Sequence, residues 1–159
     1  MLADYPGEVR IVYKNFLIHP DAARAPAHAA CAANMQGKFS EMDELLWEKG
    51  YKAGRNYSPE NLDKLAGEAG LDMAKFKADM EGACPKIIQK DQGEMQMIGT
   101  RGTPAFYING RFLSGARPIH FFKQVIDEEL KKANERIAKG TPVEKYYEEW
   151  VLKKGLKKL

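Results

Sequence analysis

Cysteine is scarce in this sequence of 159 residues, which holds only Cys31 and Cys84. These two residues form neither a Cys-x-x-Cys pair nor a metal-binding motif. Histidine is almost as scarce, and His19, His28 and His120 do not have the spacing of zinc ligands. The sequence therefore predicts no metal site and no cofactor, and its cysteine count does not indicate a cellular compartment.

A long apolar run and an excess of one sign of charge are also missing. No apolar stretch approaches the roughly 20 residues of a membrane-spanning helix, and no signal-peptide pattern follows Met1. Lys and Arg total 25 against 22 Asp and Glu, which leaves a net charge of +3 with the two signs interleaved. We therefore expect neither a nucleic-acid partner nor a membrane partner.

The most informative stretch covers residues 99–115. The apolar and aromatic residues Ala105–Ile108 predict a strand. Asn109-Gly110 predicts a type I′ hairpin turn, because both residues tolerate positive φ, and a return strand follows. Pro104 has no N–H to donate to a sheet, so we expect it at the first residue of its strand.

The rest of the sequence predicts one more strand and many helices. Glu8–Phe16 has apolar residues on both faces, which is typical of a buried strand. Met1–Tyr5 before it resembles the last turn of a helix. Helical periodicity and helix-start signals predict further helices over residues 20–35, 38–49, 58–67, 72–81, 85–98, 118–138 and 143–154.

Several of these segments together resemble a known family. Gly102-Thr103-Pro104 followed by Phe106-Tyr107-Ile108-Asn109-Gly110 is similar to the cis-proline loop and last hairpin of the thioredoxin fold, and most closely to the DsbA-like thiol–disulfide oxidoreductases. The segments at residues 9–16, 19–22 and 36–43 agree in order and spacing. The resemblance covers most of residues 5–135.

The resemblance implies an α/β protein with a thioredoxin-like fold and an inserted all-helical domain. Residues 1–19 and 99–138 would form the thioredoxin-like unit, residues 20–98 the insertion, and residues 139–159 a C-terminal helical tail. The Cys-x-x-Cys pair of the family has no counterpart in this sequence. We therefore expect an N-terminally truncated member, in which Met1 is an internal residue of a longer protein.

The family's chemistry is disulfide exchange on polypeptide substrates that carry thiols or disulfides, and a periplasmic or other extracytoplasmic location is expected for the full-length parent. By resemblance, Gly102, Thr103 and Pro104 would bind the substrate peptide, with the Thr103–Pro104 bond cis. Because the cysteine pair is absent, we expect no catalytic residue in this chain and no activity. The alternative is a non-catalytic peptide-binding or scaffold module that retains the cis-proline loop.

Cys84 is the one alternative nucleophile. Pro85 suits the first helical position, which would place Cys84 near the N-cap, where the helix dipole favours a thiolate. No resolving cysteine is adjacent. Cys31 lies in an alanine-rich helix and is interpreted as a small buried apolar residue. A Cys31–Cys84 disulfide stays open, because sequence does not set the distance between the two Cα atoms.

Truncation also predicts self-assembly. In the family a central strand lies between the strands that residues 8–16 and 105–108 resemble. Without that strand both would be exposed edges, which invite pairing with another chain. We therefore expect a homodimer with an interface above about 1,000 Å², built from residues 8–16 and 104–113.

Overall fold

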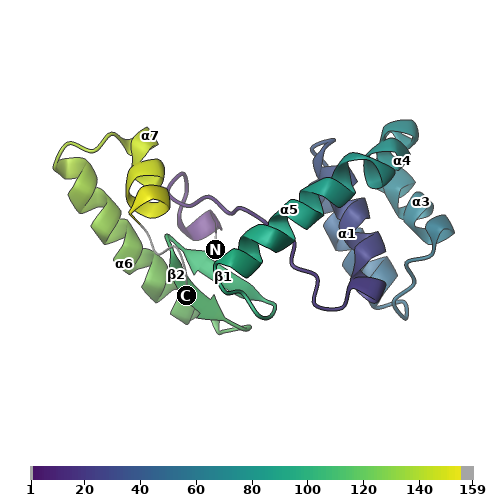
Figure 1. The fold of residues 1–159 in the computed structure, drawn as a ribbon, viewed down its shortest axis with the longest axis horizontal. Helices are drawn as coiled ribbons and strands as arrows, with labels where there is room; N and C mark the ends of the chain where they lie inside the picture. Colours follow the sequence, from purple (N-terminus) through teal and green to yellow (C-terminus); the bar gives the residue numbers. More distant parts are fainter. Residues whose placement is uncertain (1, 155–159) are drawn as a thin grey trace. The chain divides into compact units, whose positions relative to one another are not determined.

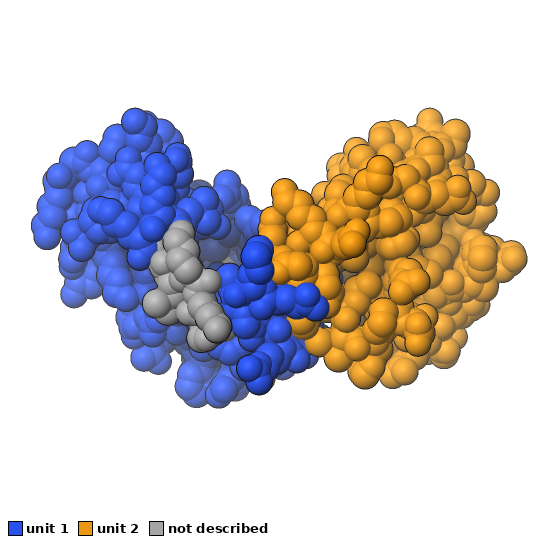
Figure 2. All heavy atoms as spheres, in the orientation of Figure 1, with its two compact units in different colours: residues 1–13, 95–159 blue, residues 14–94 orange. Residues whose placement is uncertain are grey.

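The computed structural model describes residues 2–154, which form two compact units (Figures 1 and 2). Unit 1 contains the described residues of the ranges 1–13 and 95–159, and unit 2 contains residues 14–94. Unit 1 carries a two-stranded sheet, whereas unit 2 is helical. Among the described residues, no helix is both long enough and apolar enough to cross a membrane.

Unit 2 packs its helices around an apolar core in which Met42, Leu65 and Phe76 have no exposed surface. Ser58 and Asp72 start two of the helices, because their side chains accept hydrogen bonds from main-chain N–H groups of the first turn. The elements are α1 (Pro20–Asn34), α2 (Phe39–Leu45), the π-helix η2 (Leu46–Tyr51), α3 (Pro59–Glu68), α4 (Met73–Glu81) and α5 (Ala83–Met97), whose last residues belong to unit 1.

Unit 1 is built on an antiparallel hairpin that packs against one long helix. The strands pair from Ala105 opposite Ser114 to Ile108 opposite Arg111. Phe106 contacts Phe122 of the helix edge to face, with ring centroids 4.8 Å apart. The elements are η1 (Leu2–Asp4), β1 (Ala105–Ile108), β2 (Arg111–Ser114), α6 (Ile119–Ala138), α7 (Val143–Tyr146) and the π-helix η3 (Tyr147–Lys153).

Tyr5 ties the N-terminal segment to α6. Its ring is buried with Phe122 and Ile126, and its hydroxyl donates to Asp127 Oδ1 at 2.7 Å. The hydrogen bond to Asp127 and burial raise the pKa of Tyr5 to about 12. The hydroxyl therefore stays a donor over the whole physiological pH range.

The predicted strand at Glu8–Phe16 is wrong, because Glu8 lies in a turn, and residues 9–16 form no regular element and pair with no strand of the described chain. Ile11, Val12 and Tyr13 are 57%, 58% and 64% exposed, so the segment is not buried on both faces. Apolar alternation makes a strand only where a partner supplies hydrogen bonds. The predicted helix end at Met1–Tyr5 is also wrong in type: Leu2–Asp4 is a 3₁₀ turn, and Met1 lies outside the described residues.

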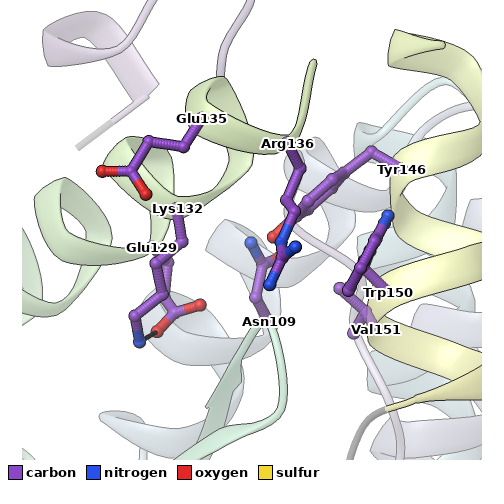
Figure 3. A pocket seen from close by; sticks show the side chains of 8 residues that line it. All are labelled: Asn109, Glu129, Lys132, Glu135, Arg136, Tyr146, Trp150 and Val151. Atoms are coloured by element: carbon purple, nitrogen blue, oxygen red, sulfur yellow. Dashed lines mark hydrogen bonds and ion pairs between the residues drawn. The ribbon is translucent and has the colours of Figure 1, made fainter. Parts of the chain in front are cut away.

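A cavity of about 230 Å³ opens in unit 1 between the hairpin tip and the C-terminal helices (Figure 3). The hairpin contributes one of its residues, α6 contributes four, and α7 with η3 contributes three. The lining residues are Asn109, Glu129, Lys132, Glu135, Arg136, Tyr146, Trp150 and Val151.

Candidate functional site

The hairpin and the loop before it form the candidate site, and the local structure follows from the turn residues. Asn109 and Gly110 have φ values of 47° and 90°, as a type I′ turn requires, so the predicted hairpin is confirmed. Pro104 directly precedes β1, and the Thr103–Pro104 peptide bond is cis. Residues 101–104 are all exposed, so the loop is accessible from solvent.

The register leaves one edge of β1 open. Next to a two-residue turn, Ile108 and Arg111 form a hydrogen-bonded pair, and such pairs alternate along an antiparallel ladder. Gly115 N donates to Pro104 O at 2.9 Å, which fits this alternation. The main-chain N–H and C=O groups of Ala105 and Tyr107 therefore point away from β2. No other described strand pairs with that edge.

Side-chain contacts fix the loop and the hairpin at both ends. The hydroxyls of Thr100 and Tyr107 lie 2.7 Å apart, and Thr100 is buried. At the other end, Arg111 pairs with Glu128 and also lies 3.4 Å from Glu129 Oε1. Hydrogen bonding from Arg111 holds the pKa of Glu128 below its ordinary value. These contacts hold β1 and the preceding loop in a set position on unit 1.

The three predicted peptide-contacting residues lie together at the start of β1, on the exposed loop. A Cβ placed on Gly102 would meet no described atom within 4 Å, so packing within unit 1 does not require glycine there. The contacts of Gly102, Thr103 and Pro104 with a substrate stay a prediction.

Residues 1–127 match the family described as DSBA-like thioredoxin domain. The chain belongs to this family. The family match and the structure confirm the α/β thioredoxin-like fold with a helical insertion, and they link the chain to disulfide oxidoreductases.

Longer proteins contain a region similar to this DsbA-like chain. The Na(+)/H(+) antiporter NhaA of Herminiimonas arsenicoxydans is 29% identical over 115 residues, which are 72% of this chain and 18% of the antiporter. The Na(+)/H(+) antiporter NhaA 3 of Salinispora tropica is 35% identical over 117 residues, 70% of this chain and 17% of the antiporter. The chain thus spans less than a fifth of the length of these relatives.

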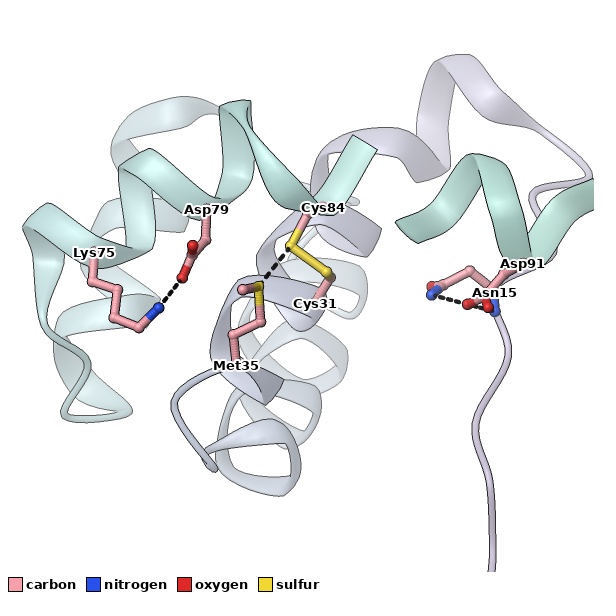
Figure 4. The surroundings of a disulfide bond; sticks show 7 residues. All are labelled: Asn15, Cys31, Met35, Lys75, Asp79, Cys84 and Asp91. Carbon is pink, nitrogen blue, oxygen red and sulfur yellow. Dashed lines mark hydrogen bonds and ion pairs between the residues drawn. A yellow bond between two sulfur atoms is a disulfide. The ribbon is translucent and has the colours of Figure 1, made fainter. Parts of the chain in front are cut away.

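The structure corrects the predicted environment of Cys84 and confirms that Cys31 is buried. Cys31 and Cys84 form a disulfide with a Cα–Cα distance of 5.8 Å, and Met35 Sδ lies 4.0 Å from Cys84 Sγ (Figure 4). Helix α5 begins at Ala83, so Cys84 is a helical residue rather than an N-cap, and it has no exposed surface. A buried, disulfide-bonded sulfur offers no thiolate to a substrate. Cys84 is therefore not a nucleophile in this structure.

Sequence reasoning missed a polar cluster in unit 2 that holds the segment entering α1. Lys14 Nζ lies 2.9 Å from Asp91 Oδ1, and the main-chain N–H and side-chain amide of Asn15 both donate to Asp91 Oδ2. Leu17 N donates to Gln92 Oε1 at 2.7 Å. Burial alone would raise the pKa of Asp91, but the hydrogen bonds from Lys14 and Asn15 outweigh it and lower the pKa. The partners are more than 70 residues apart, and no local pattern signals them.

Proposed function

We propose that this chain supplies the polypeptide-binding side of a DsbA-like thiol–disulfide exchange domain and does not exchange disulfides by itself. The observation that supports the proposal is the open edge of β1 beside the exposed loop at residues 101–104. An extended peptide that lies along this edge would exchange main-chain hydrogen bonds with Ala105 and Tyr107. Thr103 and Pro104 would contact the same peptide at the start of the strand.

The state of the two cysteines supports the proposed lack of activity. Disulfide exchange needs a thiolate that attacks a substrate disulfide, forming a mixed disulfide and releasing the other substrate sulfur as a thiolate. Cys31 and Cys84 are joined to each other, and both are buried. The same observation favours the second candidate function, a peptide-binding or scaffold module with no redox role. The two functions differ in whether a partner segment brings a Cys-x-x-Cys pair to the loop.

The edge of β1 can be tested with a matched pair of proline variants. Ala105 and Ser114 are opposite each other, and their N–H groups point to opposite edges of the hairpin. Neither Ala105→Pro nor Ser114→Pro removes a hydrogen bond between β1 and β2, and edge strands tolerate proline. The probe is reduced and alkylated insulin B chain, with binding followed by NMR shifts at residues 102–107.

We expect Ala105→Pro to weaken binding of the insulin B chain about tenfold, because one main-chain hydrogen bond is lost and the ring obstructs the edge. Ser114→Pro should bind like the unchanged chain. Equal weakening in both variants, or shifts confined to β2, would contradict binding at the β1 edge.

We further propose that the chain forms a homodimer through residues 8–16 and 104–113. Supporting this are the exposed apolar residues of the first segment and the open edge of β1. Ile11→Asp should convert the dimer to a monomer in light scattering, because it buries a charge in the interface. Ile119→Asp is the control, because Ile119 is 53% exposed, compared with 57% for Ile11, and lies outside both segments. A monomeric unchanged chain would refute the proposal.

A further inference from the structure

The cavity at the hairpin tip lies almost wholly outside the part of the chain that matches the family. The match ends at residue 127, so Asn109 is the one lining residue within it. The cavity volume of about 230 Å³ is below the roughly 300–1,000 Å³ of sites for drug-sized ligands. A ligand would therefore be small, or would be the end of a longer molecule.

Arg136 is the notable residue of this cavity. Its guanidinium carbon lies 4.0 Å from the centroid of the Trp150 ring, and the indole is fixed in turn by a hydrogen bond from Nε1 to Thr141 Oγ1. No carboxylate of the described residues forms an ion pair with Arg136. The stacking on Trp150 orients the guanidinium plane but satisfies none of its five N–H donors.

Lys132 and Glu129, two other charged residues of the lining, are paired with each other. Lys132 Nζ lies 2.6 Å from Glu129 Oε1, and Arg111 reaches the same oxygen at 3.4 Å. Lys154 adds positive charge, with its Nζ 3.7 Å from the centroid of the Trp150 ring. Of the two basic residues that line the cavity, Lys132 is paired with a carboxylate of the described chain and Arg136 is not.

Two further polar groups converge with Arg136. Figure 3 shows the Asn109 amide, from the hairpin tip, and the Tyr146 ring, from α7, beside the Arg136 guanidinium. Burial and the nearby Glu129 raise the pKa of Tyr146, so its hydroxyl stays protonated and can donate. Asn109 brings an amide N–H₂ group. The turn fixes its position, because Asn109 holds positive φ.

We propose that this cavity binds a monocarboxylate, held through its carboxylate by Arg136, Asn109 and Tyr146. The planar fork of Arg136 matches the two carboxylate oxygens. Trp150 and Val151 form an apolar wall for a small substituent. Glu135 in the same lining disfavours a dianion such as phosphate, because like charges repel across so small a site. The carboxylate belongs either to a free small acid or to the C-terminus of a peptide.

The two tryptophans make the test direct. Trp150 lines the cavity, whereas Trp47 lies on η2 in unit 2 and serves as an internal reference. The indole N–H signals of the full chain are followed by NMR during titration with isovalerate, with acetyl-Ala-Val, or with the amidated form of the same dipeptide. We expect the Trp150 signal to shift with at least one of the two acids, while the Trp47 signal stays in place.

The probes and variants separate the outcomes. A shift with isovalerate assigns the site to small acids, and a shift with acetyl-Ala-Val alone assigns it to peptide C-termini. Arg136→Gln should weaken binding about tenfold or more, because a charge-assisted hydrogen bond is lost. Tyr146→Phe keeps the ring packing and should weaken binding severalfold. Arg24→Gln, at an exposed arginine of α1 in unit 2, should change nothing.

Three results would overturn the proposal. The first is no Trp150 shift with either acid. The second is a shift of equal size with the amidated dipeptide or with inorganic phosphate, since neither carries a monocarboxylate. The third is unchanged binding in both Arg136→Gln and Tyr146→Phe, with circular dichroism showing that the variants are folded.

Discussion

Removing the Cys31–Cys84 disulfide should destabilise unit 2 and leave unit 1 nearly unchanged. The bond joins α1 to the start of α5, and both cysteines lie in unit 2. It closes a loop between residues 53 positions apart. This loop contains α2, η2, α3 and α4, so the cross-link restricts most of the unfolded chain of the unit.

The size of the effect follows from loop length. For a separation of 53 residues, the chain-entropy relation gives about 4 kcal/mol of stabilisation at 25 °C. A domain of this size is stable by only about 5–15 kcal/mol in total. The reduced unit 2 should therefore remain folded with a much smaller margin. With a denaturant slope near 2 kcal/mol/M, the urea midpoint should fall by about 2 M.

Each unit carries its own reporter for this experiment. Trp47 lies in unit 2 and Trp150 in unit 1, so single-tryptophan variants follow the two transitions separately. Urea unfolding is measured with and without dithiothreitol, and the Cys31→Ala/Cys84→Ala variant is the control that dithiothreitol should not affect. If the oxidised and reduced chains unfold at the same urea concentration, or if the Trp150 transition shifts as far as the Trp47 transition, the reasoning is refuted.

Two further predictions concern activity and acid stability. The purified chain should reduce insulin no faster than background, because no thiolate is available; turnover that disappears in Cys84→Ser would contradict this. Asp91→Asn should lower the free energy of unfolding of unit 2 by about 1–3 kcal/mol, because the hydrogen bonds from Lys14 and Asn15 reach a charged acceptor. Because the folded pKa of Asp91 is lowered, its stabilisation is present at neutral pH and is lost as the pH falls through that folded pKa. The urea midpoint of Asp91→Asn should therefore vary less than that of the unchanged chain below pH 4 or so.

The elements that the sequence predicted well are those with local causes. Asn109-Gly110 determines its turn by its own φ preferences, and the strands on either side follow. Two helices of unit 2, α3 and α4, start after Ser58 and Asp72, because each of these side chains accepts a hydrogen bond from the main-chain N–H three residues later. In such cases the interacting groups are within a few residues of one another, so a pattern can reveal them.

The main failures involve partners that are distant in the sequence. Glu8–Phe16 has the composition of a strand, but a strand also needs a neighbour, and residue pattern does not show whether one is present. The prediction that Cys84 is an N-cap with a reactive thiol depends on the adjacent Pro85. Its sulfur is instead bonded to Cys31, which is distant in the sequence. The proposed site at Arg136 depends on Asn109, from the hairpin that precedes α6 in the sequence, and on Tyr146, from the helix that follows α6. No spacing rule connects these three residues.

The segment before α1 has two parts that differ in how their main-chain N–H groups are satisfied. At Asn15 and Leu17 the main-chain N–H groups are satisfied by the side chains of Asp91 and Gln92, so this part needs no sheet partner. Ile11 and Val12, a few residues earlier, have no comparable side-chain contact among the described residues, and both are more than half exposed. Exposed apolar residues in an extended segment, together with an open edge on β1, are the features that invite strand addition. We therefore expect a second chain or another segment to pair at Ile11 and Val12, which are apolar and exposed.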